Sequence, residues 1–412
     1  MINSEFNKNS VPFLIPDMPE YQEFSRYLAE IDHNQWYSNQ GPLLDLFEKG
    51  INDCAFHLEL SNISRVVACS SGTSALELAL ISLDLPKGSK VMVPSFTFAA
   101  TVTAIIRAGY EPVFVDVDKH SWMLTPKIAQ EAISHIDVAA VLPVCTLGMP
   151  YINGEWDAFC QETGLRVVMD AAAAICDQKI STYHHTCFSL HATKFFGVGE
   201  GGVVVSPSDG GAKNIRALSN FGFSDGLITQ VGSNYKMSEY HAAVGLAQLS
   251  RWSLLKQRRK HIQKLYRKTV SKYSDFFSIQ RASVHSGDAV TLMPTGFQSA
   301  AALIINKELN VDAVDVTEKL RQRGIASRQW YTPGLHKHPA FDGVKVCGDK
   351  GCSQLTVTES LNDGMVGLPY HNHLTEKSID YIVNTLVSIV TGESISNVKR
   401  SVHGDFERSR YI

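Results

Sequence analysis

Residues 189–202 read "SLHATKFFGVGEGG" and lead directly into the β-branched run "VVVS" at 203–206. Gly197, Gly199 and Gly202 match the G-x-G-x-x-G fingerprint of dinucleotide-binding proteins by letter. That fingerprint requires a strand before the glycines and a helix after them, so that the start of the helix can bind a pyrophosphate. Because a strand pattern follows here, the order argues against this interpretation. A Walker loop also fails, since Lys194 precedes the glycines and that motif places its lysine after them.

The remaining functional interpretation is that Lys194 forms a Schiff base, and that the glycines let the backbone and a cofactor approach closely. The alternative is a surface lysine, which is the usual fate of a single lysine. A pyridoxal phosphate site would also need a carboxylate at the pyridine nitrogen, donors for the phosphate and an aromatic face on the ring. The presence or absence of these other groups near Lys194 therefore decides between the two interpretations.

The sequence around this stretch predicts a mostly parallel sheet. From about residue 64 to 206, β-branched runs such as "SKVMVPS" (89–95) and "LRVVMDAA" (165–172) alternate with amphipathic helical stretches, as in an α/β fold covered on both faces. Residues 238–273 carry apolar residues at helical spacing far beyond the usual helix length, which predicts a connector between domains. We expect a large domain over 1–250, this helix with a smaller α+β domain over 251–395, and a charged tail over 396–412.

The carboxylate candidate is Asp170, which ends an apolar strand and is followed by four alanines. Parallel sheets present chemistry at the carboxyl ends of their strands, but Asp is also a common helix N-cap, and both interpretations stay open. An aromatic face could come from "PSFTFAAT" (94–101), where Phe96 and Phe98 follow a strand, although a core role is the default for either.

The phosphate candidate is the turn "SSGTS" (70–74), which links a predicted strand to a predicted helix. Backbone N–H groups at a helix start, with Thr73 and Gly72, make an anion site without a lysine. The alternative is an N-capped helix, and the two are compatible. Ser189, five residues before Lys194, could supply another hydroxyl.

The amino-acid composition limits the classes of protein to which the chain can belong. The chain has 412 residues, 44% of them hydrophobic and 19% charged, and a net charge of -3, which is typical of a globular protein and disfavours nucleic-acid binding. The basic stretch 256–268 fits one solvated helix face. No apolar run is long enough for a membrane span and no signal peptide is recognisable, so we expect a cytoplasmic protein. Cys347 and Cys352 have no second pair beside them, so no metal site is predicted.

Five motifs together resemble the DegT/DnrJ/EryC1/StrS family of pyridoxal-phosphate-dependent nucleotide-sugar aminotransferases. They are "SGTSAL" (71–76), "PSFTFAATVTAIIRAGYEPVFVDVD" (94–118), "VVMDAAAA" (167–174), the "SLHATK" and "GEGG" stretch, and "NYKMSEYHAAVGLAQL" (234–249). The resemblance covers about residues 36–255 and continues more faintly to "GLPYHNHLT" (367–375). It implies an aspartate-aminotransferase-like (fold type I) architecture and a pyridoxal 5'-phosphate cofactor.

The resemblance also implies a role for each matching residue. Lys194 matches the lysine that binds the cofactor covalently, and Asp170 the aspartate that keeps the pyridine nitrogen protonated. Asn234 matches an asparagine that reaches the phosphate from a second subunit, which implies a homodimer with shared active sites. The remaining cofactor-binding matches are Gly72, Thr73 and Ser189 at the phosphate and Phe98 over the ring.

The chain also departs from the family pattern. Ala173 stands where a polar residue near the cofactor ring is common, and Lys236 stands where an arginine is common. "VCTLGMP" (144–150) lacks the histidine and tyrosine often found before its glycine, and "NFGF" (220–223) replaces a commoner His-Gly. These departures concern the sugar contacts more than the cofactor chemistry.

The reaction implied is the transfer of an amino group from an amino acid, expected to be L-glutamate, to C4 of a nucleotide-linked 4-keto-6-deoxyhexose. This would serve amino-sugar and surface polysaccharide synthesis, including lipopolysaccharide O-antigen. The alternatives are a 3-keto sugar substrate and a non-catalytic regulatory protein on the same fold. A dehydrating branch of the family carries a histidine in place of the lysine, whereas Lys194 is present here.

Overall fold

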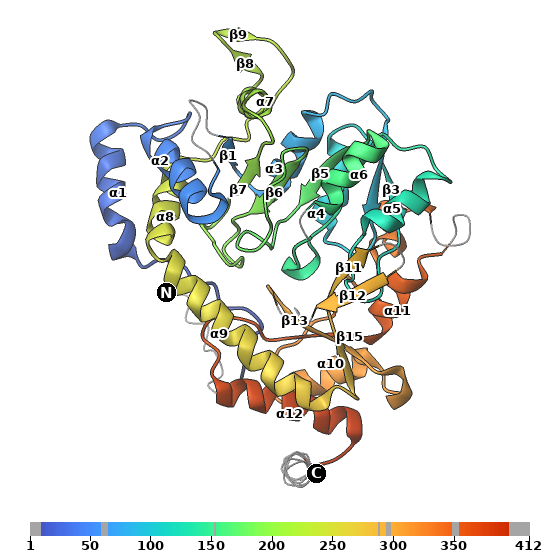
Figure 1. The fold of residues 1–412 in the computed structure, drawn as a ribbon. Helices are drawn as coiled ribbons and strands as arrows, with labels where there is room; N and C mark the ends of the chain where they lie inside the picture. Colours follow the sequence, from blue (N-terminus) through green and yellow to red (C-terminus); the bar gives the residue numbers. More distant parts are fainter. Residues whose placement is uncertain are drawn as a thin grey trace.

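The computed structural model of the chain describes residues 10–58, 65–151, 154–286, 289–293, 298–347 and 354–394. Within these residues the largest sheet has eight strands in the order β1-β7-β6-β5-β4-β2-β3-β14 (Figure 1). Neighbouring strands from β6 to β14 are parallel, and β7 is antiparallel to both β1 and β6. The predicted mostly parallel sheet is therefore confirmed. The strands are β1 (Val66–Cys69), β2 (Lys90–Pro94), β3 (Glu111–Val115), β4 (Ala140–Val141), β5 (Arg166–Asp170), β6 (His185–Ser189), β7 (Gly202–Val205) and β14 (Lys345–Cys347).

Helices cover both faces of this sheet, because successive strand residues point to opposite sides. In β5, Val168 packs into the core beneath α3, α4 and α7, while Met169 packs into the core beneath α2, α5, α6 and α8. Both strand faces are thus apolar, as a parallel sheet between two helix layers requires. The covering helices are α2 (Pro42–Ile51), α3 (Gly72–Ile81), α4 (Ala99–Arg107), α5 (Pro126–Ile133), α6 (Glu155–Thr163), α7 (Asp209–Ser219) and α8 (Glu239–Ser250).

The long helix expected over 238–273 is two helices, α8 and α9 (Trp252–Val270), which meet at Arg251. The Arg251 guanidinium donates to the Asp17 carboxylate at 2.5 Å and to Gln248 Oε1 at 2.7 Å. Because both helices bury an apolar face, the helical spacing runs unbroken through the junction. The prediction of one continuous helix was therefore wrong, and the residue at the break pairs with a residue distant in sequence.

A smaller sheet, β10-β13-β15, lies beside α9 and has a core of its own with α10 (Ala313–Gln322) and α12 (Glu376–Thr391) (Figure 1). Strand β14 also comes from the C-terminal part of the chain, but it joins the large sheet. The division of the chain at residue 250 remains a prediction. The other elements of the C-terminal part are β10 (Phe277–Ile279), β11 (Ala282–Ser286), β12 (Ala289–Met293), β13 (Ala301–Ile305), α11 (Thr356–Gly364) and β15 (Met365–Leu368). The predicted tail 396–412 and Cys352 lie outside the described residues.

Two peripheral features complete the fold. Helix α1 (Tyr21–Asn34) lies against α8, and a short hairpin of β8 (Phe223–Ser224) and β9 (Leu227–Ile228) projects from the end of α7 (Figure 1). Across the described ranges, none of the helices is both long and apolar enough to cross a membrane.

Candidate active site

Lys194 lies in a compact loop between β6 and β7. The loop folds back on itself through three backbone hydrogen bonds of 2.8 Å, from Leu190 to Gly201, from Ala192 to Gly199 and from Val198 to Leu190. Gly199 adopts a φ of 96°, which side-chain-bearing residues rarely reach. The glycines of the "GVGEGG" stretch therefore shape the loop that carries the lysine, and β7 follows them as predicted.

Asp170 is buried at the carboxyl end of β5, where its two carboxylate oxygens accept different hydrogen bonds. Oδ2 accepts from Thr101 Oγ1 at 2.8 Å and Oδ1 accepts from the Ala172 amide at 3.0 Å. The Thr101 hydroxyl in turn lies 2.9 Å from Thr97 Oγ1, so Thr97 donates to Thr101. Thr97 and Thr101 were not predicted as site residues, although both lie in the segment 94–101 that follows β2, two strands from β5 in the sheet.

The charges of Asp170 and Lys194 influence each other. Burial raises the pKa of the Asp170 carboxyl, and the hydrogen bonds from Ala172 and Thr101 and the positive charge of Lys194 oppose that rise. Burial lowers the pKa of the Lys194 amine, and the negative charge of Asp170 opposes that fall. In the described part of the chain the Lys194 amine has no hydrogen-bond partner. The amine is thus poorly solvated and available for chemistry.

The predicted phosphate turn joins β1 to α3. Ser71 is the N-cap of α3, and its Oγ accepts from the Ser74 amide at 3.0 Å. A Cβ added to Gly72 would lie 2.6 Å from the Ser189 Cβ, so Gly72 and Ser189 are packed together. Within the residues the structure covers, the Thr73 hydroxyl forms no hydrogen bond. The Ser71 cap is therefore observed and leaves Thr73 available, while anion binding at this turn remains a prediction.

Gly202 brings this turn against the lysine loop. It pairs with Cys69 of β1 on one side and with Ser189 of β6 on the other. A Cβ at Gly202 would collide with the backbone carbonyl of Ser71. Only glycine allows β7 to pass this close, so the last glycine of the lysine stretch also positions the phosphate turn.

The two candidate aromatic residues have different positions. Phe96 is fully buried and is therefore a core residue. Phe98 is the N-cap residue of α4 and is 65% exposed, so its ring is free to contact a ligand.

Asn234 lies in the segment that returns from the β8–β9 hairpin. The next residue, Tyr235, accepts a hydrogen bond from the Ser70 amide at 2.8 Å, so this segment runs beside the phosphate turn. The Asn234 side chain is exposed, and none of the described residues hydrogen-bonds to its amide group. Lys236 is held by Asn220 at 2.8 Å and lies over the Phe221 ring.

Two residues that depart from the family pattern, Cys145 and Ala173, make contacts around Asp170 and the loop that follows it. The Cys145 amide donates to the Asp170 carbonyl at 2.8 Å, and its buried thiol donates to Gln178 Oε1 at 3.2 Å. The Ala173 carbonyl accepts from Ser299 Oγ at 2.6 Å, which ties the loop after Asp170 to the segment before β13. These contacts tie the loop after Asp170 to its neighbouring segments.

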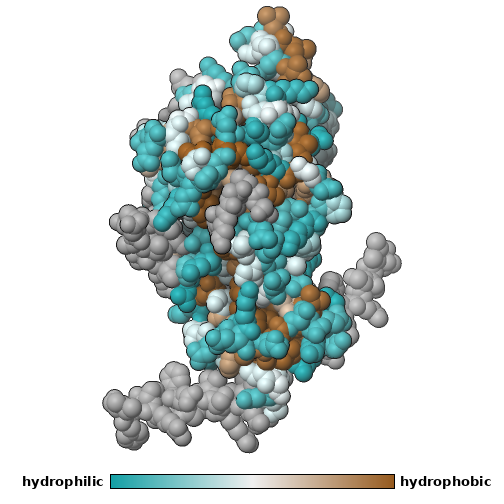
Figure 2. All heavy atoms as spheres, turned by 90° about the vertical axis from the view of Figure 1, so that its right-hand side faces the viewer, coloured by the Kyte–Doolittle hydropathy of each residue, from teal (hydrophilic) through white to brown (hydrophobic). Residues whose placement is uncertain are grey.

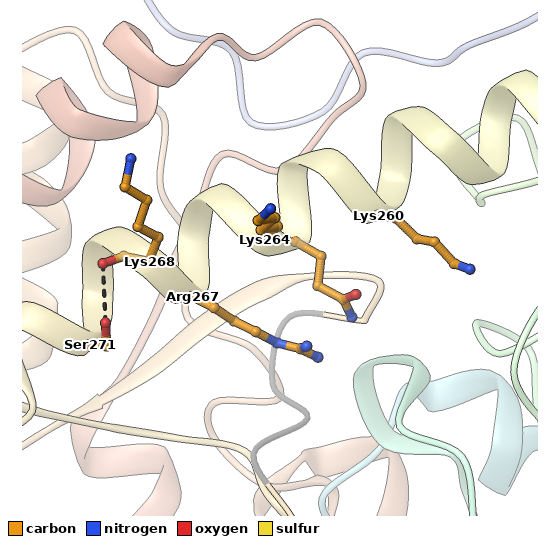
Figure 3. Close-up of a pocket in the computed structure, with 6 residues that line it drawn as sticks. Lys260, Lys264, Arg267, Lys268 and Ser271 are labelled. Carbon is orange, nitrogen blue, oxygen red and sulfur yellow. Dashed lines mark hydrogen bonds between the residues drawn. The ribbon is translucent and has the colours of Figure 1, made fainter.

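A shallow, open depression of about 640 Å³ lies elsewhere, along the polar face of α9 (Figure 3). Its lining side chains come from α9 and the turn that follows it, and neither Lys194 nor Asp170 is among them. The predicted solvated basic face of this helix is what the close-up shows. The lining residues are Lys260, Gln263, Lys264, Arg267, Lys268 and Ser271.

Residues 19–387 match the model of the DegT/DnrJ/EryC1/StrS aminotransferase family. The chain is 29% identical to a dTDP-4-amino-4,6-dideoxy-D-glucose transaminase of Shigella dysenteriae, over 91% of this chain and 97% of that protein. A solved structure of a putative PLP-dependent aminotransferase from Bacillus cereus superposes with a TM-score of 0.80 at 29% identity, covering 92% and 100% of the two chains. The structure of DesI in the presence of its TDP-sugar product superposes with a TM-score of 0.78 at 27% identity, covering 95% and 96%.

Proposed function

Because the chain belongs to the DegT/DnrJ/EryC1/StrS aminotransferase family, we propose that it transfers an amino group from L-glutamate to C4 of a nucleotide-linked 4-keto-6-deoxyhexose. The chain is a pyridoxal-phosphate-dependent transaminase of fold type I. Its similarity to a transaminase that forms a 4-amino-4,6-dideoxy sugar supports C4 as the position of amination. The observation that carries the proposal is the lysine loop, which is packed against the phosphate turn beside the buried Asp170.

The residues present fit pyridoxal phosphate. The start of α3, the free Thr73 hydroxyl and the close packing of Gly72 on Ser189 form a cradle for a phosphate group. We assign the pyridine nitrogen to Asp170 and the exposed ring of Phe98 to one face of the cofactor. When bound, the cofactor supplies an electron sink and carries the amino group between the two substrates.

We assign proton transfer to Lys194. A lowered pKa keeps a larger share of its amine neutral near pH 7, and a neutral amine can both attack a carbonyl and accept a proton. Asp170 acts by its charge, which stabilises a proton on the ring nitrogen. The hydrogen bonds from Thr101 and Ala172 hold that carboxylate in place and favour its charged form.

We also propose a homodimer in which Asn234 completes the site of the partner subunit. The hairpin beside it exposes large apolar side chains, and Figure 2 shows them as a hydrophobic tip at the top of the molecule. Val231 of the same segment is 92% exposed, and contiguous exposed apolar surface supports an interaction site here. The other exposed apolar residues of this segment are Phe221, Phe223, Leu227 and Ile228.

Mixing two inactive variants tests the shared site. Lys194→Ala chains and Asn234→Ala chains are each expected to be nearly inactive. If Asn234 serves the partner's lysine, one of the two sites in each mixed dimer is intact, and random reassociation restores roughly a quarter of wild-type activity. Failure of the mixture to regain activity, with mixed dimers demonstrated by differently tagged chains, contradicts the assignment of Asn234.

Spectroscopy of the two half-reactions tests the substrates. Glutamate should bleach the visible band of the lysine-bound cofactor, and the correct keto sugar nucleotide should restore it. Recovery of the visible band with a 3-keto sugar nucleotide and not with a 4-keto one would mean that the amino group is added at C3 instead of C4. Absence of any response to glutamate, in a protein that binds the cofactor, would favour the non-catalytic alternative. A cytoplasmic location and a role in O-antigen synthesis remain predictions.

A further inference from the structure

The motif "HAAVGLAQL" (241–249) is part of the family resemblance, yet the proposed reaction gives none of its residues a role. Gln248, near its end, is fully buried in α8. Its Nε2 donates to the Gly197 carbonyl at 3.0 Å and to the Asp17 carbonyl at 2.8 Å. Its Oε1 accepts from the Arg251 guanidinium at 2.7 Å. Both N–H groups and the oxygen of this amide are therefore used, which fixes its orientation.

Gly197 is the point at which the amide reaches the lysine loop. It lies three residues after Lys194, and its carbonyl accepts from Gln248. A Cβ added to Gly197 would lie 2.8 Å from the Cα and from the carbonyl oxygen of Ala192. Gly197 is thus packed against the backbone two residues before the lysine. A shift of its carbonyl would therefore disturb the chain on both sides of Lys194.

Aromatic side chains also hold this part of the loop, but without fixing a direction. Phe195 and Phe196 each meet Trp252 edge-on, with centroids 5.6 and 5.4 Å apart. Burial of apolar surface is non-directional, whereas a hydrogen bond constrains both distance and angle. From elsewhere in the described chain, the Gln248 amide is the only group that hydrogen-bonds to the backbone of residues 192–199. It therefore supplies the directional contact.

The second carbonyl that Gln248 binds belongs to Asp17, whose carboxylate joins several elements. It accepts from Arg251 at 2.5 Å, from Asn372 at 2.9 Å and from Arg258 at 3.3 Å. Burial raises the pKa of this carboxyl, but hydrogen bonds from Asn372 and Arg251 and the nearby arginine charges outweigh that rise and leave the pKa below its ordinary value. Asp17 therefore stays charged and is held by α9 and by the chain that follows β15.

The segment that leads to this carboxylate is itself attached to the C-terminal part of the chain. The Val11 amide donates to the Gly324 carbonyl at 2.7 Å, just after α10. The Phe13 carbonyl accepts from the Tyr370 amide at 3.0 Å, just after β15. Residues 11–17 thus run from the smaller sheet to the junction of α8 and α9. The hydrogen bonds continue from there through the buried amide of α8 to the lysine loop.

We propose that Gln248 is a positioning residue for Lys194, and that the segment 11–17 is its anchor. The Gly197 carbonyl is held by an amide that is itself held at Asp17, so the lysine loop depends on the binding of this segment. A misplacement of about 1 Å at a reacting group can slow a reaction up to about a hundredfold. This inference rests on the proposed role of Lys194 in proton transfer.

The first test compares Gln248→Leu with Gln263→Leu, because the Gln263 amide on α9 donates to Gln298 and not to the lysine loop. Hydrogen exchange of the amides in residues 190–201 is measured on the cofactor-free protein. Loss of one hydrogen bond to the loop should speed this exchange about tenfold in Gln248→Leu alone. In the cofactor-loaded enzyme, the pH titration of the visible band should shift and kcat should fall about tenfold, while KM for glutamate changes by less than about twofold.

The second test addresses the anchor. Asp17→Ala removes the carboxylate that fixes the segment, and Glu23→Gln is the control, because Glu23 also lies near Arg251, at 3.6 Å, but belongs to α1. Asp17→Ala should speed exchange of the same loop amides about threefold, and Glu23→Gln should leave it unchanged. Unfolding temperatures check that each variant is folded. If Gln248→Leu does not fold, Gln248→Asn replaces it, since its shorter side chain cannot reach both carbonyls.

Unchanged loop exchange in Gln248→Leu, or an equal change in Gln263→Leu, would overturn the role of Gln248. Faster exchange in Gln248→Leu without any change in Asp17→Ala would show that the segment 11–17 is not the anchor. Failure of the proposed function itself is visible separately, because a Lys194→Ala protein that retains turnover contradicts the role of the lysine whatever Gln248 does.

Discussion

The lysine loop over 190–201 and the hairpin segment over 221–234 are both well ordered turns, yet they bury their side chains differently. Each satisfies its backbone locally, the first through Leu190 to Gly201 and the second through Phe221 to Ser233 at 3.1 Å. The loop buries Phe196 and Val198 completely or nearly so, whereas the hairpin segment leaves Val231 in solvent. The lysine loop is thus packed within the chain, whereas the hairpin segment presents apolar surface, and this is the surface at which we propose that the second subunit binds.

Removing the lysine should have the largest effect. Lys194→Ala deletes the covalent attachment and the proton carrier together, so we expect activity to fall at least about 1,000-fold and the visible cofactor band to disappear. Lys213→Ala, an exposed lysine on α7, is the matched control and should behave as wild type. A Lys194→Ala protein that kept both the visible band and turnover would show that the lysine loop does not carry the catalytic group.

Gly202→Ala should disturb the loop without touching the lysine. The new Cβ collides with the Ser71 carbonyl, and the resulting shift of the phosphate turn should destabilise the protein by about 3 kcal/mol and weaken cofactor binding. Gly210→Ala is the control, because a Cβ there meets nothing within 4 Å. Urea unfolding and cofactor titration measure the two effects. Equal stability of the two variants would mean that β7 can move away from the turn.

Ile228→Asp should weaken the proposed dimer contact of the hairpin segment and leave the lysine loop unchanged. Ile228 is 65% exposed in the single chain, and burying a charge in its place at an interface should weaken the dimer by about 2 kcal/mol, or roughly 30-fold. Val314→Asp, at an equally exposed apolar position on α10, is the control. Sedimentation at several concentrations gives the dissociation constants. Unchanged association of Ile228→Asp would remove the hairpin from the interface.

Lowering the pH should reduce the stability of the strand that leads into the lysine loop more than the stability of the hairpin. Burial lowers the pKa of His185, the first residue of β6, to about 4 from its usual 6.5. The unfolded chain therefore binds a proton that the folded chain does not, and the free energy of unfolding should fall by about 2 kcal/mol between pH 7 and pH 5. Urea unfolding at both pH values measures this loss.

His185→Gln should reduce that pH dependence, and His135→Gln, at an exposed histidine, should leave it unchanged. His371, whose pKa burial also lowers to about 4, is expected to contribute a similar loss near the smaller sheet. A wild-type protein equally stable at both pH values would show that His185 gains a proton without unfolding.

Much of the fold and half of the site could be predicted because the relevant signals are local. The mostly parallel sheet follows from apolar runs that alternate with helical stretches, and the Lys194 loop from one contiguous stretch. The long helix over 238–273 failed as a prediction, because the apolar spacing continues through Arg251, where the structure divides the segment into α8 and α9. Arg251 donates there to Asp17, a residue more than two hundred positions away. Thr101 escaped notice as a partner of Asp170 because the two residues lie 69 positions apart in the sequence.

By itself, the sequence determined the candidates for chemistry: a lysine in a glycine-shaped loop, an aspartate at a strand end and a capped turn as the candidate anion site. Those properties depend on residue type and on neighbours a few positions away. The tertiary structure alone decided that Thr101 holds Asp170 and that Gly202 of β7 lies against the Ser71 carbonyl. Contacts between distant segments form only when burial of apolar surface brings the segments together, and no local pattern encodes that pairing.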